Sequence, residues 1–206
     1  MSLSLHKSFG VLLICAALVA SCATTQINAI WKEASYHAQP TRIMVIGVAK
    51  NPLNRRLFED EFARQIRARS TEAIASYTVL SDKLQDDQAA IAAKVKELHA
   101  DAILVTRLVR KKTVKMYVPG TVYYPPPYYG TWPDYYGYGY RHFHSPDYVT
   151  ESEYAIIETN LYESGNDKLV WAASSESLLN DSSEYLIKSY IGVMVKAMAE
   201  SGLLGK

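Results

Sequence analysis

Two runs of apolar residues most limit the folds open to this chain. They span 41–49 and 101–109, and a shorter strand candidate, 76–80, lies between them. Apolar, β-branched runs of this length are typical of strands in a sheet covered on both faces. The residues between these three segments have the apolar spacing of helices. The order strand, helix, strand, helix, strand predicts a right-handed, mainly parallel core.

Capping residues predict where the helices begin. Asn51 is suited to an N-cap and Pro52 to the first helical position, so a helix is expected from there to about Arg69. Asp86 or Asp87 is expected to cap a second helix. The predicted apolar stripes are Leu57, Phe58, Phe62 and Ile66 in the first helix and Ile91, Val95 and Leu98 in the second.

The second half of the chain has a different pattern. Residues 110–118 and 148–163 alternate, a turn signal occupies 164–167, and 168–177 reads as a returning strand, which together predict an antiparallel meander. A closing helix is expected over 183–201, ended by Gly202. The fold class predicted is α/β (α+β): a single domain with a mixed sheet of about five strands in β-α-β-α-β-β-β-α order.

The N-terminus has the pattern of a lipoprotein signal peptide. Lys7 precedes an apolar run of 12 residues, which is shorter than the roughly 20 residues that span a bilayer. The cleavage region Val19-Ala20-Ser21-Cys22 resembles a bacterial lipobox, in which small residues precede a cysteine whose thiol accepts diacylglycerol. Cys15 leaves with the signal peptide and Cys22 becomes the lipidation site, so the mature domain has neither a free thiol nor a disulfide. An ordinary signal peptide cut near Ala20 or Ser21 is the alternative.

The anchor implies a division of the chain and a location. We expect residues 1–21 to be removed, 22–39 to be the lipid anchor and a flexible tether with a reach of roughly 20–25 Å, and 40–206 to be the domain. By resemblance to the lipoproteins of Gram-negative bacteria, Ala23 in place of Asp after the cysteine implies the outer membrane, with the domain facing the periplasm. The mature chain has net charge zero and no sustained basic face, so nucleic acid is not an expected partner.

A segment rich in Tyr, Pro and Gly interrupts the meander at 119–147. The stretch 117–148 holds 10 of the 16 tyrosines and 6 of the 8 prolines, so it is predicted as a long hairpin insertion. One hypothesis is a recognition arm for an envelope protein, cell-wall glycan or the membrane interface. The alternative is a flexible insertion with no dedicated partner. The candidate contact residues are Tyr123, Tyr124, Tyr128, Tyr129, Trp132, Tyr135, Tyr136, Tyr138 and Tyr140.

Two histidines in this segment suggest a second hypothesis. His142 and His144 would project to one side of an extended strand, and Asp147 would add an oxygen ligand, which is the chemistry of a zinc or copper site. The alternative is a pair of solvated histidines. No third nitrogen or sulfur ligand is close in sequence, and we expect no cofactor beyond the lipid on Cys22.

Other polar clusters carry weaker signals. The turn at 47–52 lies where α/β folds hold phosphate, but it has neither GxGxxG nor GK[ST], so no nucleotide is expected. Lys50, Arg55 and Arg56 are expected to be solvated or paired with Glu59 and Asp60. The basic residues Arg107, Arg110, Lys111 and Lys112 are interpreted as a strand edge that deters pairing. No serine lies in GxSxG, and we expect no enzyme activity.

Several segments together resemble one family. WKEASYHAQPTRIMVIGVAKNPLNRRLFEDEF, SYTVL, ADAILVTRL, YYPPPYYG and ETNLYESGNDKLVWAASSES are similar, in this order, to a domain-of-unknown-function family of bacterial envelope lipoproteins. The predicted element order also resembles the N-terminal domain of TolB, the curli-secretion lipoprotein and a lipoprotein activator of cell-wall synthases. The resemblance implies a function through protein contact.

The function expected is therefore a non-catalytic binding or assembly module of the envelope, tethered to the outer membrane through Cys22. The first alternative is a metal or small-ligand binding lipoprotein that uses His142 and His144. A cell-wall hydrolase is the weaker alternative.

Overall fold

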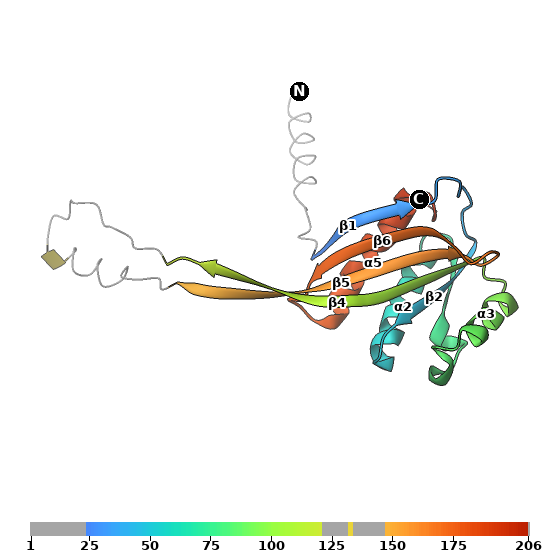
Figure 1. Cartoon of the computed structure of the whole chain (residues 1–206), viewed down its shortest axis with the longest axis horizontal. Coiled ribbons are helices and arrows are strands. Elements are labelled where there is room, and N and C mark those ends of the chain that lie inside the picture. Colours follow the sequence, from blue (N-terminus) through green and yellow to red (C-terminus); the bar gives the residue numbers. More distant parts are fainter. Residues whose placement is uncertain (1–23, 121–131, 134–146, 206) are drawn as a thin grey trace, which may run out of the picture.

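The structure is a computed structural model of the chain, and it describes residues 24–120, 132–133 and 147–205. Within them six strands form one mixed sheet in the order β1-β6-β5-β4-β2-β3 (Figure 1). The strands are β1 Thr25–Lys32, β2 Arg42–Val48, β3 Glu72–Ala75, β4 Ala102–Val118, β5 Tyr148–Glu163 and β6 Lys168–Leu178. The helices are α2 Pro52–Arg67, α3 Gln88–Glu97 and α5 Ser183–Glu200. The predicted α+β class and single domain are confirmed.

The caps form as the sequence predicts. Asn51 accepts a hydrogen bond from the Leu53 N–H at 2.9 Å, and Asp87 accepts one from the Ala90 N–H at 3.0 Å. Beyond α5, Gly202 has a φ of 75°, the left-handed conformation that glycine adopts with little cost. The predicted starts of α2 and α3 and the predicted end of α5 are therefore confirmed.

Helices cover the two faces of the sheet unequally. Helices α2 and α5 pack side by side on one face, where Trp171, Phe62 and Tyr190 lie in the larger core. Helix α3 packs on the other face, where Val95 meets Met44. Along β1, β6 and β5, the face turned away from α2 and α5 carries half-exposed side chains, such as Ala172 and Asn160.

The predicted flexible tether is wrong over 25–32. Residues 25–32 form β1, an edge strand that pairs antiparallel with β6, and Thr25 is buried with its hydroxyl 2.7 Å from that of Ser177. The strand is hard to recognise because polar and apolar side chains do not alternate strictly along it: Ile30 and Trp31 are both 48% exposed, and Ile27 is its apolar side chain that packs against the core. The sheet has six strands because β1 adds one to the five expected.

Two smaller predictions also change. The second parallel strand is Glu72–Ala75, and the predicted strand 76–80 begins instead with a 3₁₀ turn over Ser76–Thr78. The backbone leaves the strand at Ser76 because the Ser76 hydroxyl and the Tyr77 N–H donate hydrogen bonds to the buried carboxylate of Glu59. Leu57, predicted in the apolar stripe of α2, is 40% exposed, whereas Phe62 and Ile66 are fully buried.

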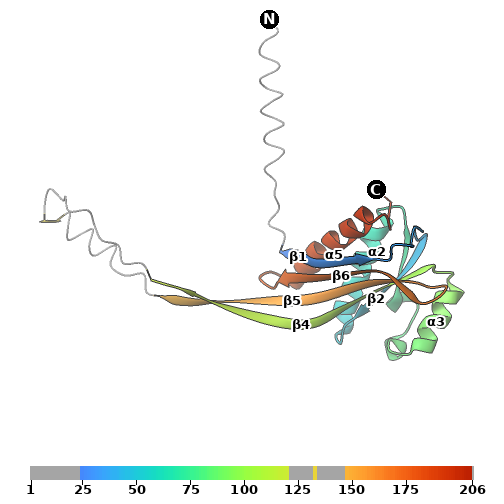
Figure 2. The same ribbon diagram turned by 45° about the horizontal axis from the view of Figure 1, so that its top comes forward.

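Strands β4 and β5 continue beyond the sheet as a two-stranded ribbon (Figures 1 and 2). Pairing of β4 with β2 ends at Arg107, and pairing of β5 with β6 ends at Tyr154. The ribbon, defined here as 113–118 paired with 148–153, has no strand on either side. At about 3.4 Å per residue it is roughly 20 Å long. It leads to the insertion predicted at 119–147.

Candidate functional site

Most of the predicted site residues lie outside the described residues. These are Cys22, His142, His144, and every predicted contact tyrosine. Trp132 is described and is 78% exposed. Asp147, the proposed third metal ligand, accepts a hydrogen bond from the Tyr117 hydroxyl. Within the described ranges no cluster of three or more His, Cys, Asp or Glu side chains has the geometry to hold a metal.

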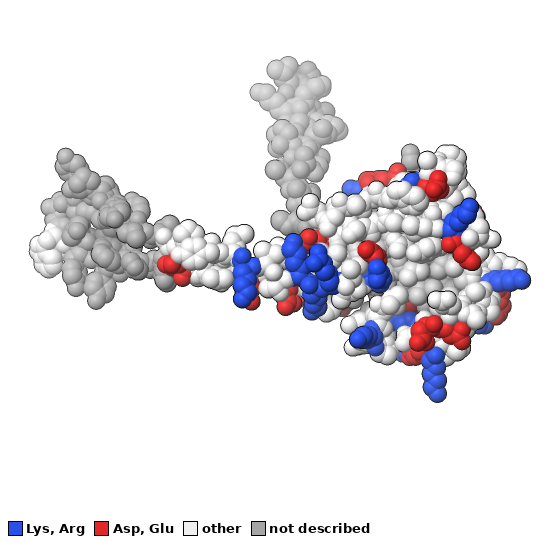
Figure 3. Space-filling view, in the orientation of Figure 1, with Lys and Arg blue, Asp and Glu red and all other residues white. Residues whose placement is uncertain are grey.

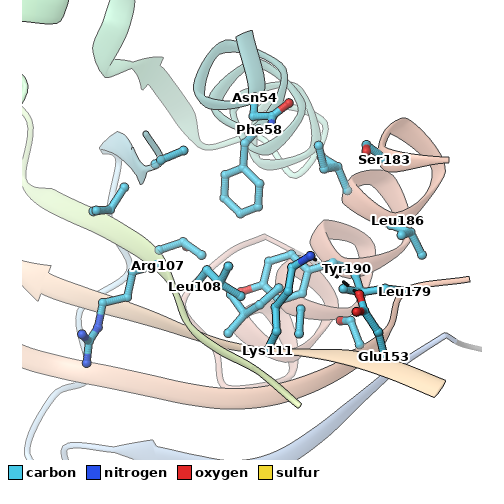
Figure 4. A pocket seen from close by; sticks show the side chains of 18 of the residues that line it. Asn54, Phe58, Arg107, Leu108, Lys111, Glu153, Leu179, Ser183, Leu186 and Tyr190 are labelled. Carbon is cyan, nitrogen blue, oxygen red and sulfur yellow. Dashed lines mark ion pairs between the residues drawn. The ribbon is translucent and has the colours of Figure 1, made fainter. Parts of the chain in front are cut away.

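The structure reveals a cleft that the sequence did not indicate. It has a volume of about 420 Å³ and lies between the first turns of α2 and α5, above β4, β5 and β6. Figure 4 shows Phe58 reaching from α2 toward Leu108 and Tyr190. Apolar side chains supply most of the lining, namely Val48, Ala49, Phe58, Leu108, Ala155, Ile157, Leu179, Leu186 and Ile187. A volume of this size is typical of small-ligand sites.

Hydroxyl groups at the base of the cleft are already satisfied. The Tyr190 hydroxyl bonds to that of Thr159, which lies 2.9 Å from the hydroxyl of Thr106. Burial raises the pKa of Tyr190 above its usual value, and hydrogen bonds from Thr159, Thr106 and Ser175 offset only part of this effect. Tyr190 therefore stays a neutral phenol that fixes α5 to the sheet.

The rim of the cleft carries charges of both signs. Lys111 on β4 and Glu153 on β5 form an ion pair of 3.8 Å at one side, and both side chains are more than half exposed (Figure 4). Asp181 and Ser183 lie at the start of α5, and Asn54 lies in the first turn of α2. A mixed rim around an apolar floor suits an amphipathic segment better than a highly charged ligand.

A buried ion pair supports the wall of the cleft. Arg55 is 2% exposed and Glu59 is fully buried, and the Arg55 Nε donates to Glu59 Oε1 at 2.9 Å. The same carboxylate accepts hydrogen bonds from the N–H of Gly47, the hydroxyl of Ser76 and the N–H of Tyr77. The prediction that Arg55 pairs with Glu59 is confirmed, but the pair is in the interior and is not solvated.

This network also occupies the turn at 47–52. The N–H of Gly47 donates to Glu59 at 3.0 Å, so an internal carboxylate takes the backbone donor that a phosphate would use. A Cβ at Gly47 would lie 3.4 Å from Glu59 Cγ and Phe58 Cδ1, which leaves little room for a larger residue. In the sequence, this network was indicated only by the spacing of Arg55 and Glu59, which lie four residues apart on a helix.

The basic residues of β4 line both faces of its outer half. Beyond Arg107 the strand has a free edge, which agrees with the predicted strand edge, and most of these residues form ion pairs across the sheet. The pairs are Arg107–Glu158, Lys111–Glu153, Lys112–Glu176 and Lys115–Glu151. Figure 3 shows charges of both signs where the two-stranded extension joins the body of the domain.

The fold and cleft together define a mixed α/β domain with an open, mainly apolar binding cleft. None of the residues that line the cleft is His or Cys. None of the described helices is long and apolar enough to cross a membrane.

Comparisons with known proteins give distant structural neighbours. No family model matches the chain, and no curated protein matches it, so the family predicted above remains a prediction. A PelC dodecamer from Paraburkholderia phytofirmans has 12% identity, covers 88% of this chain and 99% of its own, and has a TM-score of 0.46. Lipoprotein GNA1162 from Neisseria meningitidis has 14% identity, covers 78% and 99%, and has a TM-score of 0.41.

Proposed function

We propose that this protein is a non-catalytic binding module of the bacterial envelope, anchored to the outer membrane through lipid on Cys22 and facing the periplasm. Its cleft receives an apolar segment of an envelope protein. The observation that carries the proposal is the apolar cleft itself, which lies open between α2 and α5 and has a rim of paired charges.

The chemistry of the cleft favours a protein segment over a glycan strand. Sugars are bound through many polar donors and acceptors, whereas the hydroxyls at the base of this cleft are already bonded to one another. Apolar side chains of a partner would displace water from Phe58, Ile157 and Leu186 without leaving polar groups unpaired. The lipobox of the sequence supports the anchor.

Photocrosslinking in cells tests the proposal. A photoreactive residue at Leu108, which lines the cleft and is 51% exposed, is expected to capture one protein of defined mass. Leu84 is the matched control, because it is a 39% exposed leucine that does not line the cleft. Equal capture from both positions, or only cell-wall fragments from Leu108, would contradict the proposal.

The tyrosines of the insertion stay a separate prediction. Deleting 120–146 in the same assay asks whether this segment contributes to capture. A loss of the Leu108 adduct would add Tyr123 to Tyr140 to the binding surface. An unchanged adduct would leave the cleft as the site and remove the insertion from it.

A further inference from the structure

The lipid anchor is attached almost directly to the folded domain. Thr24 is held by β6, since its C=O accepts a hydrogen bond of 2.8 Å from the N–H of Leu178, and its hydroxyl lies 3.1 Å from that of Ser189 on α5. Cys22 is only two residues before Thr24. At about 3.5 Å per residue, its Cα lies within about 7 Å of Thr24. The domain is therefore held at the membrane surface by a linker too short to let it move away.

The ribbon begins beside this anchor point. Leu178, the partner of Thr24, pairs with Tyr154 on β5, and the next residue of β5, Glu153, is the first in the ribbon. Two strand spacings separate Thr24 from Tyr154, which is about 10 Å. A bilayer that holds the lipid of Cys22 must consequently pass close to the base of the ribbon.

The two faces of the ribbon differ in polarity. In a strand, successive side chains project to opposite faces, and paired residues share a face. The face turned away from the cleft has no charged residue, and it consists of Val114, Met116, Val118, Tyr148, Thr150 and Ser152. The opposite face, which continues from the cleft, carries Thr113, Lys115, Tyr117, Val149, Glu151 and Glu153. We call these the apolar face and the charged face of the ribbon.

The apolar face has no partner within the described chain. Met116 is 62% exposed and Tyr148 is 56% exposed, whereas the charges on the other face are paired, with Lys115 and Glu151 at 2.6 Å. An isolated two-stranded ribbon is only marginally stable in water, so covering one face would stabilise it. The sequence that joins the two strands, 119–146, contains only Asp134 and Arg141 among charged residues and is rich in Tyr. Aromatic, weakly charged sequence is typical of the membrane interface.

We propose that the apolar face of the ribbon lies in the interfacial region of the same bilayer that holds the lipid of Cys22. The inference rests on the proposed function for the anchor alone. The lipid brings the bilayer to the ribbon base, the apolar face contacts it, and the charged face stays in water. The ribbon then acts as a second membrane contact that fixes the orientation of the cleft relative to the membrane.

Single-cysteine labelling tests this orientation in the lipidated, full-length mature protein. Because Cys15 is removed and Cys22 is acylated, a new cysteine is the only thiol in the chain. The positions Val114→Cys and Met116→Cys probe the apolar face, and Thr113→Cys and Lys115→Cys are matched controls on the charged face. Each variant carries an environment-sensitive fluorophore and is reconstituted into vesicles of phosphatidylethanolamine and phosphatidylglycerol.

Nitroxide-labelled lipid is expected to quench the apolar-face labels several-fold more than the control labels, and iodide in the buffer is expected to show the reverse order. Equal quenching of the two faces by iodide would place the ribbon in water and overturn the inference. Protection of the apolar face from both quenchers would also overturn it, because in pure protein that result means contact with a second copy.

A failure of the anchor is recognised separately. Mass spectrometry of each variant before reconstitution shows whether Cys22 carries acyl chains, and an unmodified Cys22 contradicts the proposed anchor. The ribbon is then tested in the Cys22→Ser chain by flotation with the same vesicles. Met116→Asp is expected to lower the partition coefficient about tenfold relative to Thr113→Asp. Equal partition coefficients of these two variants would overturn the ribbon inference.

Discussion

Glu59 illustrates how single residues hold the cleft in place. Its carboxylate joins β2, α2 and the turn that follows β3, through Gly47, Arg55 and Ser76. A buried ion pair is costly to desolvate, and it is tolerated where further hydrogen bonds satisfy both groups. Here the side chain of Arg55 also donates to Asp82 and Ser76, so neither charge is left without compensation.

Replacing Glu59 should therefore be severe. Glu59→Gln keeps the shape but removes the buried counterion of Arg55 and leaves only the partly exposed carboxylate of Asp82 at 3.2 Å, so we expect the free energy of unfolding to fall by about 3 kcal/mol. Glu97→Gln is the control, because it breaks an exposed pair with Lys94 and should cost less than about 1 kcal/mol. Urea unfolding measures both changes, and similar losses in the two variants would contradict the role given to Glu59.

Asp101 makes a second, pH-dependent contribution. Burial raises the pKa of its carboxyl, but hydrogen bonds from the Thr41 hydroxyl and from the N–H groups of Thr41 and Arg42 outweigh that effect and hold the pKa below its usual value. A lowered carboxyl pKa stabilises the fold above the unfolded value of about 3.9 and loses this effect as pH falls through the folded pKa.

The stability of Asp101→Asn should differ most from the parent at neutral pH. The difference in the free energy of unfolding is expected to be constant down to about pH 4 and to shrink at lower pH, as the parent carboxyl becomes protonated. Urea unfolding across this range measures it. A difference that grows as the pH falls below 4 would show that the assigned direction of the pKa shift is wrong.

At the scale of the elements, local chemistry made the helices predictable. Asn51, Asp87 and Gly202 act on the backbone of residues near them in sequence, so their roles follow from the local sequence alone. The cleft, in contrast, joins Gly47, Ala155 and Leu186, and no local pattern shows that residues so far apart will meet. Strand β1 was missed for a similar reason. Its sequence is largely polar, and it forms a strand because its backbone pairs with β6, which lies far along the chain.

The two isoleucines of β1 distinguish a strand from a tether. Ile27 packs against the core, whereas Ile30 is 48% exposed on the same strand. Ile27→Ala should lower the free energy of unfolding by about 1–2 kcal/mol, since the side chain is half-buried, and Ile30→Ala should change it by less than about 0.5 kcal/mol. Thermal or urea unfolding compares them. If neither variant lowered the free energy of unfolding, the result would contradict the strand and favour a flexible tether.

At the scale of the whole molecule, the replacement of a tether by β1 changes how the proposed lipid anchor would hold the domain. A flexible tether of 17 residues would let the domain turn freely, whereas the single residue Ala23 between Cys22 and the hydrogen-bonded Thr24 would restrict it. Alternation in the sequence predicted both strands of the ribbon. Its position beside the anchor was not predictable, because it depends on the pairing of β1, β6 and β5.

Lengthening the linker should separate anchoring from orientation. Twelve Gly and Ser residues inserted after Ala23 add a coil with a mean reach of about 20 Å. We expect unchanged thermal unfolding and unchanged membrane association, but weaker lipid quenching of a label at Met116→Cys. An insertion of the same length at the exposed turn beside Gly165 is the control. Unaltered quenching after the first insertion would mean that the short linker does not orient the ribbon.

The attachment of lipid to Cys22 is the central claim, and the intact mass of the mature protein from native membranes tests it most directly. We predict a chain that begins at Cys22 and carries three acyl chains, as the resemblance to bacterial lipoproteins implies. A chain of unmodified mass, or one that begins at another residue, would contradict it.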